Sequence, residues 1–161
     1  TQGLSLPLLI IAKDTFLNPL PMSLHVDILL KDIMVRKVIT IDPDKTARDA
    51  ARLMADNNIS SVIVMKGDEI VGIVTERDLV RKVCANDIPS SKVNIVSVMS
   101  APVITAESDL PIEAAVQRMF NNRIRRLPVV ENGKLVGIVT ISDIAKHMRT
   151  KWLIEKIFDD K

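Results

Sequence analysis

The sequence predicts an α+β protein built from two βαββα units that stack sheet to sheet about a pseudo-twofold axis. The first reason is an internal repeat with an offset of 65 residues: residues 32–83 match residues 97–148 without a gap, with 16 identities in 52 positions. The second is that both repeats alternate strand-like and helix-like apolar patterns in the same order. The third is that each unit has a single layer of helices, so its sheet keeps one open face. Stacking two units buries both faces and leaves two related clefts between them.

The first repeat, residues 26–86, begins with a short helix and continues as strand, helix, strand, strand, helix. Ala47, Ala50, Ala51 and Met54 recur at positions i, i+3, i+4 and i+7 and form one apolar helical stripe. Thr46 precedes them and can cap the first turn. The sequence predicts a helical lead-in at 26–34, strands at 37–41, 61–65 and 70–75, a turn at 66–69, and helices at 46–58 and 76–84.

A polar connection at 85–92 leads into the second repeat, residues 92–149, which follows the same order. Pro111 fits the first turn of its helix, where the missing N–H is not needed. The predicted elements are a strand at 103–105, a helix carrying Ile112, Ala115, Val116 and Met119, strands at 127–131 and 134–140 joined by an Asn-Gly turn, and a helix from Ile141 through Phe158. The helical tail, residues 150–161, has no counterpart in the first repeat. It either forms an interface or packs back on the core.

The N-terminal extension, residues 1–25, also has no partner in the repeat. Its apolar run at 4–12 is interrupted by Pro7 and is shorter than the ~20 residues that a membrane helix needs. We therefore predict no membrane association. We expect residues 1–21 to be a cloning remnant or a poorly specified extension, with Met22 as the natural initiator.

The composition excludes several classes of function. Aromatic residues make up only 2% of the chain, which argues against aromatic platforms that stack single-stranded bases. The net charge of +2 gives no general attraction to nucleic acid or membrane. Cys84 is the only cysteine, and neither His25 nor His147 has a metal-ligand spacing. We expect no disulfide, no metal site and a cytoplasmic location.

One short motif occurs once in each repeat, at the end of a predicted strand and the start of the helix that follows. It reads Gly-Ile-Val-Thr-x-x-Asp and spans residues 72–78 and 137–143. An aspartate at a helix start can accept hydrogen bonds from two ribose hydroxyls, with the threonine beside it, and free N–H groups there favour phosphate. The same spacing is typical of a helix-capping box, so capping and binding are both open.

The repeated motif and the order of elements closely resemble a tandem pair of cystathionine beta-synthase (CBS) domains, also called a Bateman module, over about residues 26–149. The resemblance implies regulatory binding of AMP, ADP or ATP, with S-adenosylmethionine a less favoured ligand. It also implies a homodimer. In that family one site takes its aspartate from one repeat and its apolar contacts from the other.

Carried over position by position, the resemblance gives two sites. The first comprises Ile138, Thr140, Ser142 and Asp143, faced by Met34, Ile39, Ile59 and Ser60. The second comprises Ile73, Thr75, Arg77 and Asp78, faced by Met99, Ile104, Ile124 and Arg125. The apolar members of both sets also fit an ordinary core. Gly72 and Gly137 fit either close packing or a cleft that a side chain would obstruct.

The repeats differ in their cations. Arg123, Arg125 and Arg126 stand where the first repeat has Asn58, Ser60 and Ser61. Arginine suits bidentate phosphate binding. We expect two inequivalent sites, with the Asp143 site the more basic and the one that holds a di- or triphosphate.

Three other functions compete with a nucleotide sensor. An enzyme is disfavoured because the sequence has no nucleophile–base pair and no phosphate-cradling glycine-rich loop. A nucleic-acid-binding protein would use the basic residues Arg123, Arg125, Arg126, Lys146, Arg149 and Lys151. A protein-interaction module with empty sites is the third. The sequence favours a stand-alone sensor that regulates a partner enzyme or a second subunit.

Overall fold

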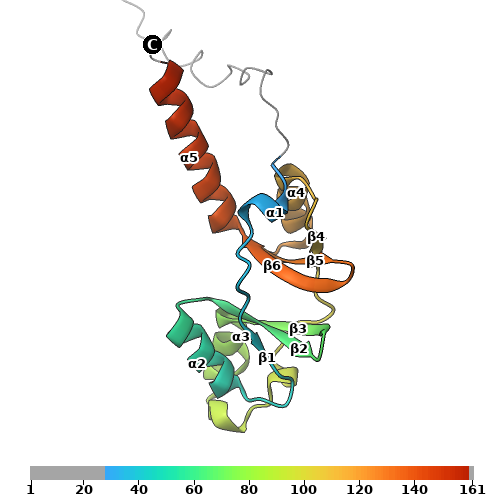
Figure 1. Ribbon diagram of the computed structural model, residues 1–161. Coiled ribbons are helices and arrows are strands. Elements are labelled where there is room, and N and C mark those ends of the chain that lie inside the picture. The colour runs from blue at the N-terminus through green and yellow to red at the C-terminus, as the bar shows by residue number, and fades with distance from the viewer. Residues whose placement is uncertain (1–27, 160–161) are drawn as a thin grey trace, which may run out of the picture.

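The computed structural model describes residues 28–159, with side chains up to Thr150, and confirms the α+β class (Figure 1). It contains two three-stranded sheets, ordered β1-β2-β3 and β4-β5-β6. The helices are α1 (Leu30–Ile33), α2 (Ala47–Asn57), α3 (Glu76–Lys82), α4 (Ile112–Asn122) and α5 (Ile141–Asp159). The strands are β1 (Thr40–Ile41), β2 (Ser61–Lys66), β3 (Glu69–Thr75), β4 (Ala106–Glu107), β5 (Arg126–Glu131) and β6 (Lys134–Thr140). The predicted extension at 1–25, including His25, lies outside the described residues.

The long elements begin and end within two residues of their predicted limits, whereas the first strand of each repeat differs. Strand β1 keeps only the end of the predicted 37–41 segment, and β4 follows the predicted 103–105 segment instead of occupying it. The apolar residues before each strand line the clefts described below, so their hydrophobicity does not mark a strand. None of the helices in the described part of the chain is long and apolar enough to cross a membrane.

The two halves contact each other reciprocally, which confirms the pseudo-twofold arrangement. Val35 pairs with Ile138 as an isolated antiparallel bridge, and Ile73 pairs with Ser100 in the same way. Each residue of one bridge lies 65 positions from a residue of the other. The segments that contain Val35 and Ser100 therefore pair with β6 and β3 in equivalent ways.

The lead-in segment of each repeat packs in the other half. Leu30, in α1, is fully buried in the core cluster of the second repeat together with Met119 and Leu127. Its counterpart Ile95 is fully buried in the core cluster of the first repeat. Figure 1 shows α1 beside α4 and β6, from where the chain descends to β1 in the other lobe. The core of each lobe is thus completed by residues from the start of the opposite repeat.

The glycines of the repeated motif are positions of close packing. A Cβ on Gly72 would lie 2.8 Å from Met99 Cγ, and one on Gly137 would lie 2.9 Å from Met34 Cγ. Real Cβ atoms do not approach other carbons this closely. Of the two explanations left open by the sequence, the structure supports close packing at both glycines. The side chains that face them are the two methionines predicted to face the ligand.

Two candidate clefts between the repeats

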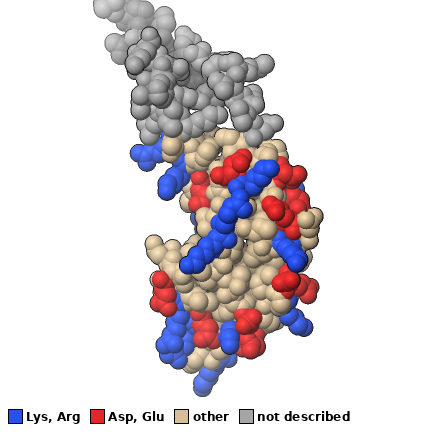
Figure 2. All heavy atoms as spheres, viewed as in Figure 1, with Lys and Arg blue, Asp and Glu red and all other residues tan. Residues whose placement is uncertain are grey.

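Two cavities lie between the lobes, and each contains one aspartate of the repeated motif. The Asp78 cleft has a volume of about 630 Å³ and the Asp143 cleft about 510 Å³, both within the range of small-ligand sites. Figure 2 shows a hollow between the lobes on one side of the molecule. The Asp78 cleft is lined by Ser60, Ile73, Thr75, Glu76, Arg77, Asp78, Ser100, Pro102, Val103, Ile104, Arg123, Ile124, Arg125, Arg126, Pro128, Thr140, Ile141 and Ser142. The Asp143 cleft is lined by Val35, Lys37, Val38, Ile39, Met54, Ala55, Asn58, Ile59, Ser60, Ser61, Ile63, Glu76, Ile138, Thr140, Ser142 and Asp143.

Each aspartate is held by a capping box at the start of its helix. Asp143 Oδ2 accepts hydrogen bonds from the Thr140 backbone N–H at 2.8 Å and from its hydroxyl at 2.7 Å, while Asp143 N–H donates to Thr140 Oγ1 at 3.2 Å. Thr75 and Asp78 form the same three bonds at 2.9, 2.8 and 3.2 Å. Capping is therefore present in both copies. Because the hydroxyl proton of each threonine is used by the aspartate, the threonine positions the carboxylate, whose Oδ1 is directed elsewhere.

A third capping box shows that this geometry alone does not make a binding site. Thr46 and Asp49 form the same bonds at the start of α2, and neither residue lines a cleft. Hydrogen bonds from the Thr46 backbone N–H and then from its hydroxyl lower the pKa of Asp49 below its ordinary value of 3.8. The binding argument for Asp78 and Asp143 therefore rests on the clefts around them.

The lowered pKa of Asp49 predicts a pH-dependent contribution to stability. Because the folded-state pKa lies below the unfolded one, the carboxylate stabilises the fold above about pH 3.8, and this stabilisation is lost as the pH falls through the lowered pKa. Asp49→Asn should reduce the free energy of unfolding near pH 7 and have progressively less effect toward about pH 2.5. Urea unfolding across this range measures the difference, with Asp56→Asn on the same helix as control. An equal loss at both ends of the range would contradict it.

The two aspartates differ at Oδ1. Lys82 Nζ lies 3.2 Å from Asp78 Oδ1 and also donates to the Val98 backbone carbonyl. The position that corresponds to Lys82 in the second repeat is His147. Among residues 28–150, no hydrogen bond or ion pair is formed by Asp143 Oδ1. Among the described residues, Asp143 Oδ1 therefore has no partner, whereas Asp78 Oδ1 is paired with Lys82.

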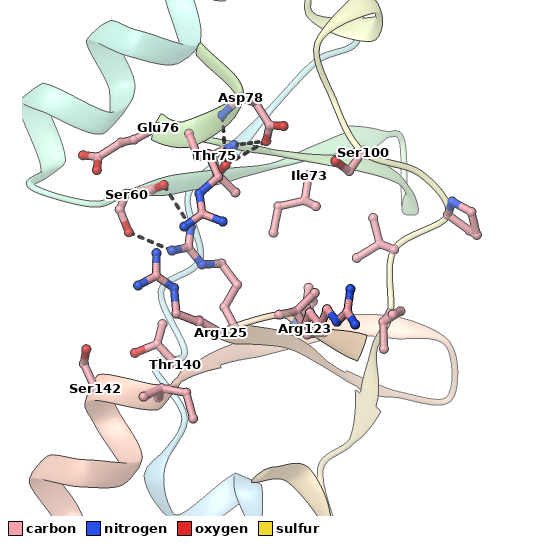
Figure 3. Close-up of a pocket in the computed structure, with 18 residues that line it drawn as sticks. Ser60, Ile73, Thr75, Glu76, Asp78, Ser100, Arg123, Arg125, Thr140 and Ser142 are labelled. Atoms are coloured by element: carbon pink, nitrogen blue, oxygen red, sulfur yellow. Dashed lines mark hydrogen bonds between the residues drawn. The ribbon is translucent and has the colours of Figure 1, made fainter. Parts of the chain in front are cut away.

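The arginines lie in the Asp78 cleft, so the expectation that the Asp143 site is the more basic is wrong. Arg123, Arg125 and Arg126 all line the cavity of Asp78, and none of the arginines between residues 28 and 150 lines that of Asp143. Figure 3 shows Thr75 and Asp78 on one side of this cleft and Arg123 and Arg125 facing them from the other. The physical reason is that each cleft combines one repeat's motif with the other repeat's helix end. The arginines that follow α4 therefore meet the aspartate of the first repeat.

Arg126 bridges the two repeats within the cleft wall. Its Nη1 donates to the Ser60 backbone carbonyl at 2.9 Å and its Nη2 to Ser60 Oγ at 3.1 Å (Figure 3). Burial and then the neighbouring charge of Arg125 lower the pKa of Arg126, while Glu76 and Asp78 act in the opposite direction. Ser60, Glu76, Thr140 and Ser142 line both cavities, so this bridge stands at the boundary between them.

Arg123 has a left-handed backbone conformation that asparagine or glycine adopts more easily than arginine. It ends α4 in the left-handed conformation with φ of 53°, as Asn58 ends α2 with φ of 52°. Asparagine tolerates this conformation, whereas for most residues it costs about 1 kcal/mol. An arginine at this strained position, facing a cavity, is consistent with a binding role.

Most of the predicted site residues line the cleft expected for them, Arg123 and Arg126 line the other cleft, and two residues line neither. Met34 and Met99 line neither cavity, because they pack against Gly137 and Gly72. The prediction missed Glu76, which lines both clefts, and in the segments before β1 and β4 it included only Ile39 and Ile104. The 65-residue offset carries a signal for those segments: Lys37 and Val38 in one cleft correspond to Pro102 and Val103 in the other.

Within the described residues, no group of three or more His, Cys, Asp or Glu side chains is arranged to hold a metal ion. Both clefts offer a capped carboxylate, hydroxyls and an apolar wall, and the Asp78 cleft also offers arginines. This set suits recognition of a polar ligand with an apolar ring system.

Comparison with known proteins identifies the family. The CBS domain model matches the chain twice, at residues 30–85 and 95–150. Protein MK0525 of Methanopyrus kandleri is 45% identical over 115 residues, which are 70% of this chain and only 59% of that protein. The solved CBS domain pair of protein MJ0100, in complex with 5′-methylthioadenosine and S-adenosyl-L-methionine, is 30% identical with a TM-score of 0.70 and covers 77% of this chain and 98% of that one. A hexameric CBS-CP12 protein from bloom-forming cyanobacteria is 32% identical with a TM-score of 0.70, covering 74% and 67%. The chain belongs to the CBS domain family and consists, over most of its length, of a tandem pair of CBS domains.

Proposed function

We propose that the chain is a regulatory module that binds an adenosine nucleotide, AMP, ADP or ATP, between its two CBS domains. CBS domain pairs are typically regulatory ligand-binding modules, and the pair in MJ0100 is in complex with two adenosine compounds. The observation that carries the proposal is the lining of the Asp78 cleft. Four arginines and a capped carboxylate surround a cavity large enough for a nucleotide.

Each part of a nucleotide has a suitable partner in this cleft. Asp78 Oδ1 accepts from ribose hydroxyls, which compete with or add to Lys82 because a carboxylate oxygen has more than one acceptor site. Arg123 and Arg125 bind the phosphates by charge-assisted hydrogen bonds. The base lies against the apolar side chains of Ile73, Ile104 and Ile124.

Regulation follows from the position of the ligand between the domains. Asp78 belongs to one domain and Arg123, Arg125 and Arg126 to the other, so a bound nucleotide links the two domains. The ligand shifts the module toward whichever arrangement it binds more tightly, and a partner enzyme senses the difference. A sulfonium compound such as S-adenosylmethionine is disfavoured here because its positive charge meets four arginines.

The other functions considered from the sequence have less support. A nucleic-acid-binding protein needs its cations on an open face, whereas Arg123, Arg125 and Arg126 line a cavity. Basic and acidic side chains are also mixed over the face in Figure 2. If RNA or DNA binds with a steep salt dependence and nucleotides do not bind, this alternative replaces the sensor.

We also propose that the module forms a homodimer and works in the cytoplasm. Phe120 on α4 is 79% exposed, and Val80 on α3 and Met148 on α5 are 58% and 60% exposed. Exposed apolar side chains mark a contact surface where they form a contiguous patch. A monomer mass in sedimentation equilibrium at micromolar concentration would reject the dimer. The single cysteine, Cys84, is exposed and suits a reducing compartment.

Titration calorimetry with AMP, ADP, ATP and S-adenosylmethionine tests the nucleotide proposal. We expect ATP to bind the wild type with a Kd below about 1 mM, and Asp78→Ala to weaken it by about tenfold through loss of a charged hydrogen bond. Asp49→Ala is the matched control, because it removes the same kind of capping box outside both clefts. Binding of no nucleotide below millimolar concentration would refute the proposal. An equal effect of both variants would show that Asp78 acts only through helix stability.

A further inference from the structure

The two clefts have opposite formal charges. The Asp78 cleft is lined by four arginines and two carboxylates, which gives +2. The Asp143 cleft is lined by Lys37, Glu76 and Asp143, which gives −1. A phosphate group carries one to two negative charges, so it is attracted to the first cavity and repelled by the second.

The difference arises at matched positions of the two repeats. Where the Asp78 cleft has Arg123, Arg125 and Arg126, the Asp143 cleft has Asn58, Ser60 and Ser61. The position of Glu76 is occupied in the second repeat by Ile141. Among the described lining residues, the Asp143 cleft therefore lacks every arginine of the other site, whereas both clefts share the carboxylate of Glu76. Lys37 is the only cation among its described lining residues.

The rest of the Asp143 cleft is nevertheless suited to a nucleoside. Asp143 Oδ2 is fixed by Thr140, and its Oδ1 is unpaired among residues 28–150, as described above. Ribose hydroxyls are the donors that match this free acceptor. Ile39, Ile59 and Ile138 supply an apolar wall for a base.

We propose that the Asp143 cleft takes a nucleoside without phosphates, uncharged or cationic, while the Asp78 cleft takes the nucleotide. This inference rests on the proposed function, because it assigns ligand classes to the same pair of clefts. The chain then binds two compounds at once. The anionic one is excluded from the Asp143 cleft because Lys37 alone, among the described lining residues, offsets the charges of Glu76 and Asp143. Selection by repulsion is a common source of specificity.

Adenosine, an uncharged probe, tests the assignment in calorimetry. We expect one ATP to bind per chain, and one adenosine to bind the ATP-saturated protein. Asp143→Asn should lower the affinity for adenosine at least tenfold more than the affinity for ATP, and Asp78→Asn should do the reverse.

A charge-exchange variant provides the second arm and does not remove a capping residue. Ser61→Arg with Glu76→Gln changes the formal charge of the Asp143 cleft from −1 to +1. This variant should bind two ATP per chain. The inference is overturned if the wild type already binds two ATP, if ATP and adenosine compete for one site, or if the exchange leaves ATP stoichiometry at one. Adenosine failing to bind while ATP binds also overturns it and leaves the proposed function intact, whereas no binding of either compound refutes both.

Discussion

Replacing both Arg123 and Arg125 with alanine is expected to weaken ATP binding by at least about 100-fold. Both side chains are exposed and line the Asp78 cleft, so their loss removes phosphate contacts without opening the core. A hydrogen bond to a charged group contributes about 1.5–3 kcal/mol, and about 1.4 kcal/mol corresponds to tenfold in affinity. The effect should be smaller for AMP, which has fewer phosphates.

Titration calorimetry at two salt concentrations measures this loss. Arg48→Ala is the control, because Arg48 is an exposed arginine of α2 that lines neither cleft. The double variant should also show a weaker salt dependence, since two cations no longer contribute to attraction. ATP affinity within about twofold of the wild type would mean that the phosphates bind elsewhere.

Leu30→Ala is expected to lower the free energy of unfolding by about 2–5 kcal/mol. Leu30 is fully buried although α1 has only four residues, and it contributes to the core of the lobe that contains β5 and β6. The loss of a large buried side chain removes hydrophobic contacts and leaves a cavity. The unusual feature is the location of the loss of stability, which should lie in the second lobe even though Leu30 belongs to the start of the first repeat.

Hydrogen exchange locates that damage. In Leu30→Ala, amides of β5 and β6 should lose protection more than those of β2 and β3, and Ile95→Ala should produce the opposite pattern, because Ile95 is the matched residue in the other lobe. Lys31→Ala, an exposed neighbour, is the control. A loss confined to β2 and β3 in Leu30→Ala would contradict the exchange of lead-in segments.

The repeat explains why so much of the fold follows from the sequence. Period and turn signals place α2, α4 and both hairpins, because each pattern appears twice and the copies support each other. The same signals misplace the strands before α2 and α4. Val38, Ile39, Val103 and Ile104 are apolar because they line clefts, and a hydrophobic run does not distinguish a cleft wall from a strand.

The exchange of lead-in segments has no local signal. The sequence shows that Leu30 and Ile95 are apolar, but burial in either lobe would satisfy the same pattern. The backbone settles it: Leu30 N–H donates to the Leu110 carbonyl at 2.9 Å, and Ile95 N–H donates to the Lys45 carbonyl at 2.9 Å. Such contacts depend on the path of the chain between lobes, which composition and periodicity do not encode.

The candidate site was predictable in its residues and not in its electrostatics. The resemblance to CBS domains places Asp78, Asp143 and their apolar neighbours in clefts, as the structure has them. The error concerned the arginines: Arg125 was placed opposite Asp78, yet the cluster as a whole was expected to make the Asp143 site the more basic. Because each cleft combines residues of both repeats, the arginines of the second repeat lie with the aspartate of the first. Glu76 was missed because its position in the wall shared by the two clefts is visible only in the structure.

An NMR titration of the wild-type protein with ATP tests most directly whether a nucleotide binds between the two domains. The account predicts that backbone amides of residues 73–78 and of residues 123–126 shift together, with a common Kd below about 1 mM. These segments belong to different repeats and meet only at the Asp78 cleft. Shifts confined to one repeat, or no shifts at millimolar ATP, would contradict the account.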